Sequence, residues 1–230
     1  MSERTQQILI LLAMFTVAVV FWNTIVIYPI KIFVVMLHEI SHGLMAEMVG
    51  GDIIKIEISP QIGGSCTSTR PAGFFPNFMI ASAGYLGSLL WGAIIFLIAA
   101  RTDYDRYLTA VIGVGSLVIT YFVIKSGGLF GIVFCSAFSV AMLLSVKFFP
   151  HTFHDYFLKF IGLTSCLYVL LDINSDLISR TGIGSDADKI AEITGIPSII
   201  IGIIWMAIAA LIVFLMLKNS VRIKKSLNQH

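Results

Sequence analysis

Long apolar runs separated by short polar stretches constrain the fold of this chain more than any other feature. The runs lie at about residues 8–29, 32–49, 76–100, 107–124, 128–148, 156–177 and 197–217. A helix of about 18 apolar residues can cross the hydrocarbon core of a bilayer, and a soluble protein has no use for so many of them. The runs predict an all-α polytopic membrane protein with seven transmembrane helices, or six as the alternative count.

The composition indicates one integral domain over residues 1–230, in contact with the lipid bilayer. Hydrophobic residues make up 57% of the chain and charged residues 12%, whereas soluble domains are about a quarter charged. A net charge of +2 gives no argument for a nucleic-acid partner. The three cysteines are odd in number and far apart, which indicates neither a disulfide framework nor a cysteine metal site.

The basic residues between the runs indicate an orientation. With seven spans, more of the Lys and Arg residues fall on the side of the C-terminus than on the opposite side. The positive-inside rule then predicts a cytosolic C-terminus. The pattern is compatible with a bacterial plasma membrane and with an organellar membrane, and it carries no signal for a particular oligomeric state.

Two stretches depart from the apolar helical pattern. Residues 53–69 alternate β-branched and polar side chains around a turn from Pro60 to Gly64, which predicts a β-hairpin just after the second run. Residues 185–196 begin with Ser and Asp, continue with helix-forming residues and end at a Gly-Ile-Pro sequence. That order predicts a short amphipathic surface helix.

The sequence His38-Glu39-Ile40-Ser41-His42 lies inside the second apolar run. Side chains four residues apart share a face of a helix, so both imidazoles can face one ion. A catalytic zinc usually has three protein ligands, with imidazole nitrogens at about 2.0–2.1 Å, and keeps a fourth position for water. Glu39 is adjacent to the first candidate ligand and is placed to take the proton of that water.

Three ionisable groups within one turn of a membrane span cost several kcal/mol unless they are paired, coordinated or in contact with water. A divalent cation such as Zn²⁺ compensates this cost directly, and it lowers the pKa of a bound water to about 7. The alternative is that His38, Glu39 and His42 form a hydrogen-bonded cluster between helices without a metal. The residues favour a zinc site.

In these features the sequence resembles the site-2 protease family of intramembrane zinc metalloproteases, and most of all its compact members without a PDZ domain. The resemblance rests on HEISHG in a membrane span, the hairpin-like segment after it, and Ala83-Gly84-Tyr85-Leu86-Gly87-Ser88 in the next span. It covers most of residues 30–190. It implies a zinc metalloendopeptidase that cleaves membrane-protein substrates within or next to their transmembrane segments, as in regulated intramembrane proteolysis.

The second motif departs from the family pattern. Better-known members read Ala-Gly-Pro with a later Asn, where Tyr85 and Ser88 stand in this chain. The candidate substrate-binding residues are therefore Gly84 and Ser88, with Ser88 or a nearby backbone donor stabilising the oxyanion. The edge of the predicted hairpin could receive an unwound substrate segment as an added strand.

The third zinc ligand has three candidates. In site-2 proteases it is the Asp of a Leu-Asp-Gly motif on a later span, and the nearest match is Leu171-Asp172-Ile173, so Asp172 comes first. Asp176, one helical turn later on the same face, could replace it or hold a ligand in place. Asp186 is the third candidate, although an acidic residue at the start of a helix also favours the helix dipole.

Two other functions are compatible with a membrane zinc site. A zinc-binding membrane protein without proteolytic activity, such as a transporter or sensor, would line its other spans with acidic or His residues, which are sparse here. An inactive protease relative that acts as a binding partner would most simply have lost its base, whereas Glu39 is present. The residues therefore favour a protease.

Overall fold

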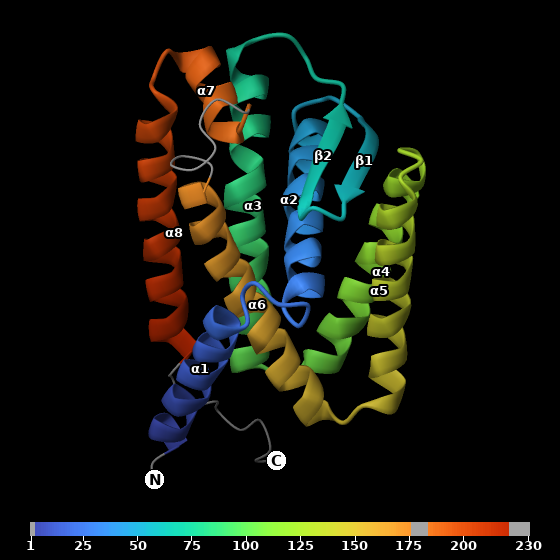
Figure 1. Ribbon diagram of the computed structural model, residues 1–230, viewed down its shortest axis with the longest axis vertical. Coiled ribbons are helices and arrows are strands. Elements are labelled where there is room, and N and C mark those ends of the chain that lie inside the picture. Colours follow the sequence, from blue (N-terminus) through green and yellow to red (C-terminus); the bar gives the residue numbers. More distant parts are fainter. Residues whose placement is uncertain (1–2, 176–183, 221–230) are drawn as a thin grey trace.

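The computed structural model describes residues 3–175 and 184–220, and Figure 1 shows the order of their elements. The elements are α1 (Glu3–Val20), α2 (Tyr28–Met48), β1 (Ile53–Ser59), β2 (Gly63–Ser68), α3 (Phe74–Arg101), α4 (Asp105–Ile124), α5 (Leu129–Phe148), α6 (His151–Asn174), α7 (Asp186–Thr194) and α8 (Ser198–Ser220). The expected helical fold with a hairpin after the second helix is confirmed.

Within the described ranges, five helices are long and apolar enough to cross a membrane, namely α3, α4, α5, α6 and α8. The apolar part of α1 is shorter and covers Thr5–Val20. Helix α2 has 21 residues, but Lys31 and the polar side chains at 38–42 lower its hydropathy. These helices fit an integral membrane protein, and the count of seven or six spans stays a prediction.

The first two helices meet at a bend that the apolar pattern does not indicate. The first apolar run extends to about residue 29, but α1 ends at Val20 and residues 21–27 form turns. Helix α2 starts at Tyr28, with Pro29 in its first turn, where the missing N–H of proline costs no hydrogen bond. Turns within the first apolar run thus end α1 at Val20, before the end of the run.

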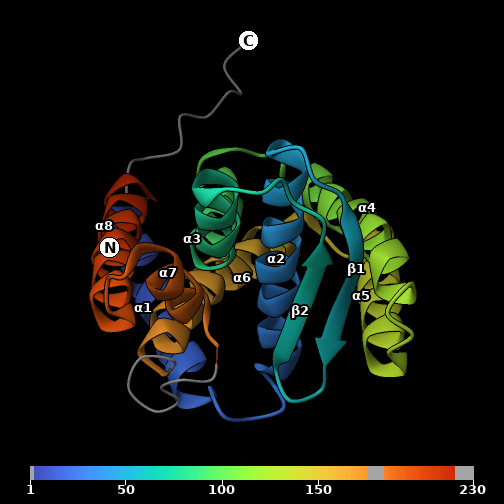
Figure 2. The ribbon, with the colours of Figure 1, turned by 90° about the horizontal axis from the view of Figure 1, so that it is seen from above.

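The hairpin packs directly on α2. Strands β1 and β2 pair antiparallel, from Ile53 opposite Ser68 to Ser59 opposite Gly63. Ile53, Ile56 and Ile58 of β1 are buried, and a Cβ on Gly43 of α2 would lie 2.7 Å from Ile53 Cδ1. Figure 2 shows β2 beside α2 and β1 on the side of α4 and α5. Glycine at position 43 therefore lets the helix approach the sheet closely.

Helix α3 is held between α2 and α6. A Cβ on Gly162 of α6 would lie 2.6 Å from the carbonyl oxygen of Gly92 on α3, so the two backbones approach closely. Close approach through small residues is the usual way in which helices associate in a membrane. On its other side, α3 turns Gly87 toward Ser41 of α2 in an equally close contact. This packing fixes the position of α3 along the axis of α2, next to residues 38–42.

Candidate metal centre

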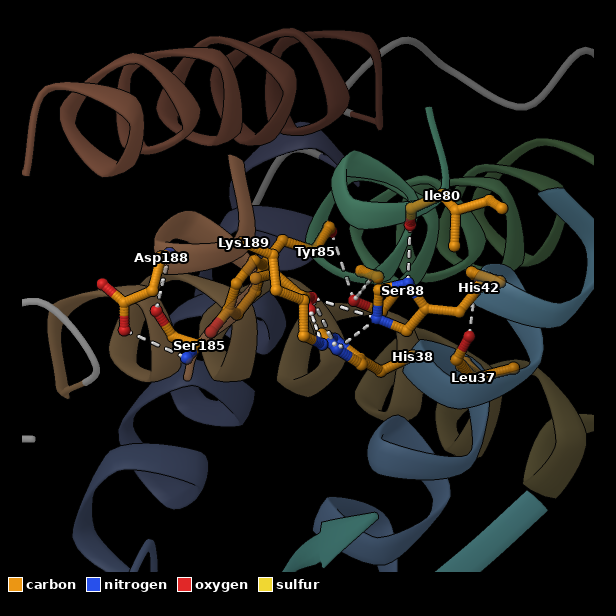
Figure 3. Close-up of polar contacts among 12 residues, drawn as sticks. Leu37, His38, His42, Ile80, Tyr85, Ser88, Ser185, Asp188 and Lys189 are labelled. Carbon is orange, nitrogen blue, oxygen red and sulfur yellow. Dashed lines mark hydrogen bonds and ion pairs between the residues drawn. The ribbon is translucent and has the colours of Figure 1, made fainter. Parts of the chain in front are cut away.

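The imidazoles of His38 and His42 face one another on α2, with 3.1 Å between their Nε2 atoms (Figure 3). His42 Nδ1 lies 2.7 Å from the carbonyl oxygen of Ile80 on α3. A carbonyl oxygen only accepts, so Nδ1 carries the proton and donates this hydrogen bond. The lone pair of His42 Nε2 is therefore free to bind a cation, and α3 fixes the orientation of the ring.

Asp186, the first residue of α7, completes the group. Its Oδ2 atom lies 3.1 Å from His38 Nε2 and 3.0 Å from His42 Nε2, and its side chain is only 5% exposed. In the described part of the chain, these three residues form the one group of His, Cys, Asp and Glu whose ligand atoms all lie within 4.8 Å of one another.

The distances within this group fit a zinc ion. The three ligand atoms form a nearly equilateral triangle with sides of 3.0 to 3.1 Å. Ligands at about 2.0–2.1 Å from a tetrahedral zinc are about 3.3 Å apart. Asp186 Oδ2 is buried, and no group in the described residues donates it a hydrogen bond of good geometry. A cation would satisfy this oxygen, and two imidazoles with one carboxylate are a common donor set for zinc.

The two histidines lower the pKa of the Asp186 carboxyl. Burial raises the pKa of its carboxyl, but the neighbouring His42 and His38 lower it by more, so the pKa lies well below the usual range. A metal binds the carboxylate and not the acid, so a lowered pKa favours the form of Asp186 that can coordinate a cation.

Glu39 lies beside this group under the hairpin. Its side chain is buried, and a Cβ on Gly64 of β2 would lie 2.8 Å from Glu39 Cγ. A cavity of about 700 Å³ is lined by Glu39, the two histidines and Asp186, and by residues of β2 and the start of α3. Glycine at position 64 thus lets the strand approach the glutamate, and the cavity has room for a peptide segment.

Comparison with known proteins decides the family. A family model described as Peptidase M50B-like matches residues 11–216. The chain is a member of the site-2 protease family. None of the curated proteins and none of the solved structures compared with the chain matches it. Members of the M50 family are zinc metallopeptidases, in agreement with a His-His-Asp group in a helical membrane protein.

Among the candidates for the third ligand, the fold brings Asp186 to the histidines. Asp172, the first choice from the sequence, lines the same cavity from the end of α6 but is not part of the close group. Asp176 lies outside the described residues. In the sequence, Ser185 indicates where the helix that carries Asp186 begins. Its side chain caps α7 by accepting a hydrogen bond from Asp188 N.

Gly84 and Ser88 make close contacts inside the protein, and their expected contact with substrate stays a prediction. A Cβ on Gly84 would overlap the Nε2 atoms of both histidines, so this glycine makes room for the two rings. Ser88 is 1% exposed, and its hydroxyl donates to the carbonyl oxygen of Gly84 at 2.9 Å, within α3 (Figure 3). Tyr85 lines the cavity instead, with its ring centroid 5.0 Å from that of His38.

We expect Gly84→Ala to weaken zinc binding, because the added methyl group displaces both imidazoles. Overpacking of this kind costs roughly 1–3 kcal/mol, which corresponds to about 5- to 150-fold in affinity. Competition with a calibrated chelator measures the change. Gly115→Ala is the matched control, since a Cβ there meets nothing within 4 Å. Equal zinc affinity in the two variants would contradict the prediction.

Proposed function

We propose that this site-2 protease hydrolyses peptide bonds within or next to transmembrane segments of membrane-protein substrates, with His38, His42 and Asp186 as zinc ligands and Glu39 as general base. The observation that carries the proposal is the convergence of three ligand atoms, 3.0 to 3.1 Å apart, in a cavity that Glu39 also lines. Asp186 thus takes the place that the sequence motif assigned first to Asp172.

The residues of the site divide the chemistry between them. When bound, a zinc ion would polarise the substrate carbonyl and acidify a water molecule. Glu39 accepts a proton from the water as its oxygen attacks the carbonyl carbon, and returns the proton to the amine nitrogen as the C–N bond breaks. The hydrogen bond from His42 Nδ1 to Ile80 O keeps the ring in place during these steps.

Strand β2 provides a place for the substrate backbone. It pairs with β1 along one edge, and residues 63–68 line the cavity. A transmembrane helix must be locally extended before its peptide bonds can be attacked, and the hydrogen bonds that it loses need replacements in an apolar medium. A substrate segment added to β2 as a strand would gain such bonds beside Glu39.

Cleavage and metal dependence together test the proposal. The purified protein, reconstituted into liposomes, is incubated with a synthetic transmembrane peptide that carries a helix-breaking residue, and the products are identified by mass spectrometry. We expect cleavage within the apolar segment, loss of cleavage after zinc chelation, and recovery when zinc is restored. Cleavage that persists in the zinc-free protein would overturn the zinc assignment, and a zinc-loaded protein without activity on any such peptide would overturn the protease proposal.

A further inference from the structure

The carboxylate of Asp186 is shared between two partners. Its Oδ2 atom faces the histidines, whereas Oδ1 lies 3.0 Å from the ammonium group of Lys189, one turn later on α7. The two side chains differ in burial, since Asp186 is 5% exposed and Lys189 is 56% exposed. Lys189 also lines the cavity, so its charge stands at the border between a buried carboxylate and the space for substrate.

The capped start of α7 favours the ion pair between Lys189 and Asp186. Ser185 caps the helix, with Asp188 N donating to Ser185 Oγ at 3.2 Å and Ser185 N donating to Asp188 Oδ2 at 3.1 Å. Asp188, the other acidic residue of the first turn, is thus used in the capping box. Asp186 and Lys189 are three residues apart on one face of the capped helix, where opposite charges attract.

Carboxylates bind metals through one oxygen or through both. A catalytic zinc needs a position that no protein atom fills, and a second oxygen from Asp186 would occupy it. Oδ1 is buried with its residue, so it requires a partner, which is either the metal or Lys189.

On this basis, which rests on the proposed function, we propose that Lys189 is a positioning residue. By binding Oδ1, it restricts Asp186 to coordination through Oδ2 alone and so preserves the open coordination position that water and the substrate carbonyl need. The residue makes no contact with the reacting atoms in this role, and its effect is transmitted through Asp186.

The test compares Lys189→Met, which keeps the length of the side chain without its charge, with Lys189→Arg, which keeps the charge. Zinc content is measured by mass spectrometry, and kcat/KM is measured with the transmembrane peptide. X-ray absorption at the zinc edge gives the distance from zinc to the carboxylate carbon, which is shorter when both oxygens bind than when one does. We expect Lys189→Met to retain zinc, to bind it through both oxygens of Asp186, and to lose about 10- to 100-fold in kcat/KM, as for other partners of metal ligands. Lys189→Arg should restore one-oxygen coordination and most of the activity.

Lys147→Met, at the end of α5 and outside the cavity, is the control for loss of a lysine. Unchanged zinc coordination in Lys189→Met would overturn the inference while the wild-type protein still cleaved its substrate. So would two-oxygen coordination by Asp186 in the wild type, a measurement that needs no variant to fold. Loss of zinc from Lys189→Met would also overturn it, because the lysine would then be needed for binding itself. A wild type that neither binds zinc nor cleaves would instead overturn the proposed function.

Discussion

The Glu39→Gln variant is expected to bind zinc like the wild type and to lose roughly 10²- to 10⁴-fold in kcat, the range attributed to general acid–base catalysis. Glutamine has nearly the shape of glutamate, so the close contact of residue 39 with Gly64 on β2 is preserved. Its amide cannot take a proton from water. Zinc content and peptide cleavage, measured on the same preparation, check both halves of this prediction.

Glu47→Gln is the matched control on the same helix. Glu47 Oε1 accepts a hydrogen bond from Ile53 N at 2.9 Å, and it is not among the residues that line the cavity. The amide oxygen of glutamine can accept the same bond, so this variant should cleave at the wild-type rate. If Glu39→Gln cleaves as fast as Glu47→Gln, residue 39 is not the base.

The second large effect is expected for Asp186→Ala, which should release zinc, whereas Asp172→Ala should retain it. Alanine at position 186 removes one of three ligands and leaves two histidines to hold the ion. We expect the loss in affinity to exceed the roughly 10- to 100-fold that follows removal of a partner of a ligand. Zinc content after dialysis against a weak chelator measures the difference between the variants.

Both aspartates line the same cavity, which makes Asp172→Ala a close control for the loss of a carboxylate there. Thermal unfolding of both metal-free variants in detergent separates loss of the ligand from loss of the fold. Zinc retained by Asp186→Ala and lost from Asp172→Ala would return the third ligand to α6 and exclude α7 from the centre.

Local features of the sequence were sufficient to predict most of the helices, the hairpin and the common face of the two histidines, but not the end of α1 at Val20. Apolar length determines where a helix can cross a bilayer, and alternation with a central turn determines a hairpin. His38 and His42 share a helix face through the geometry of a single turn. Each of these predictions needs only residues that are close in the chain.

Contacts between segments that are far apart in the sequence could not be predicted in this way. Spacing alone does not say whether Asp172 or Asp186 returns to α2, because the answer depends on how α6, α7 and α3 pack. Gly84 was a candidate for substrate binding, yet its nearest neighbours are two imidazole rings, and only the packing of α3 against α2 places it there. The hydrogen bond of Ser88 could have been predicted from the sequence, since a serine inside a helix often donates to the carbonyl oxygen four residues earlier.

The position of Asp186 has a consequence for biogenesis. The histidines lie on α2, and the ribosome must add the hairpin and four further long helices before it reaches the carboxylate on α7. During that interval the nascent chain offers two donors and lacks the oxygen that would complete the triad. Under the proposed assignment, the protein can hydrolyse peptide bonds only after the hairpin and α3 to α7 have been synthesised and inserted.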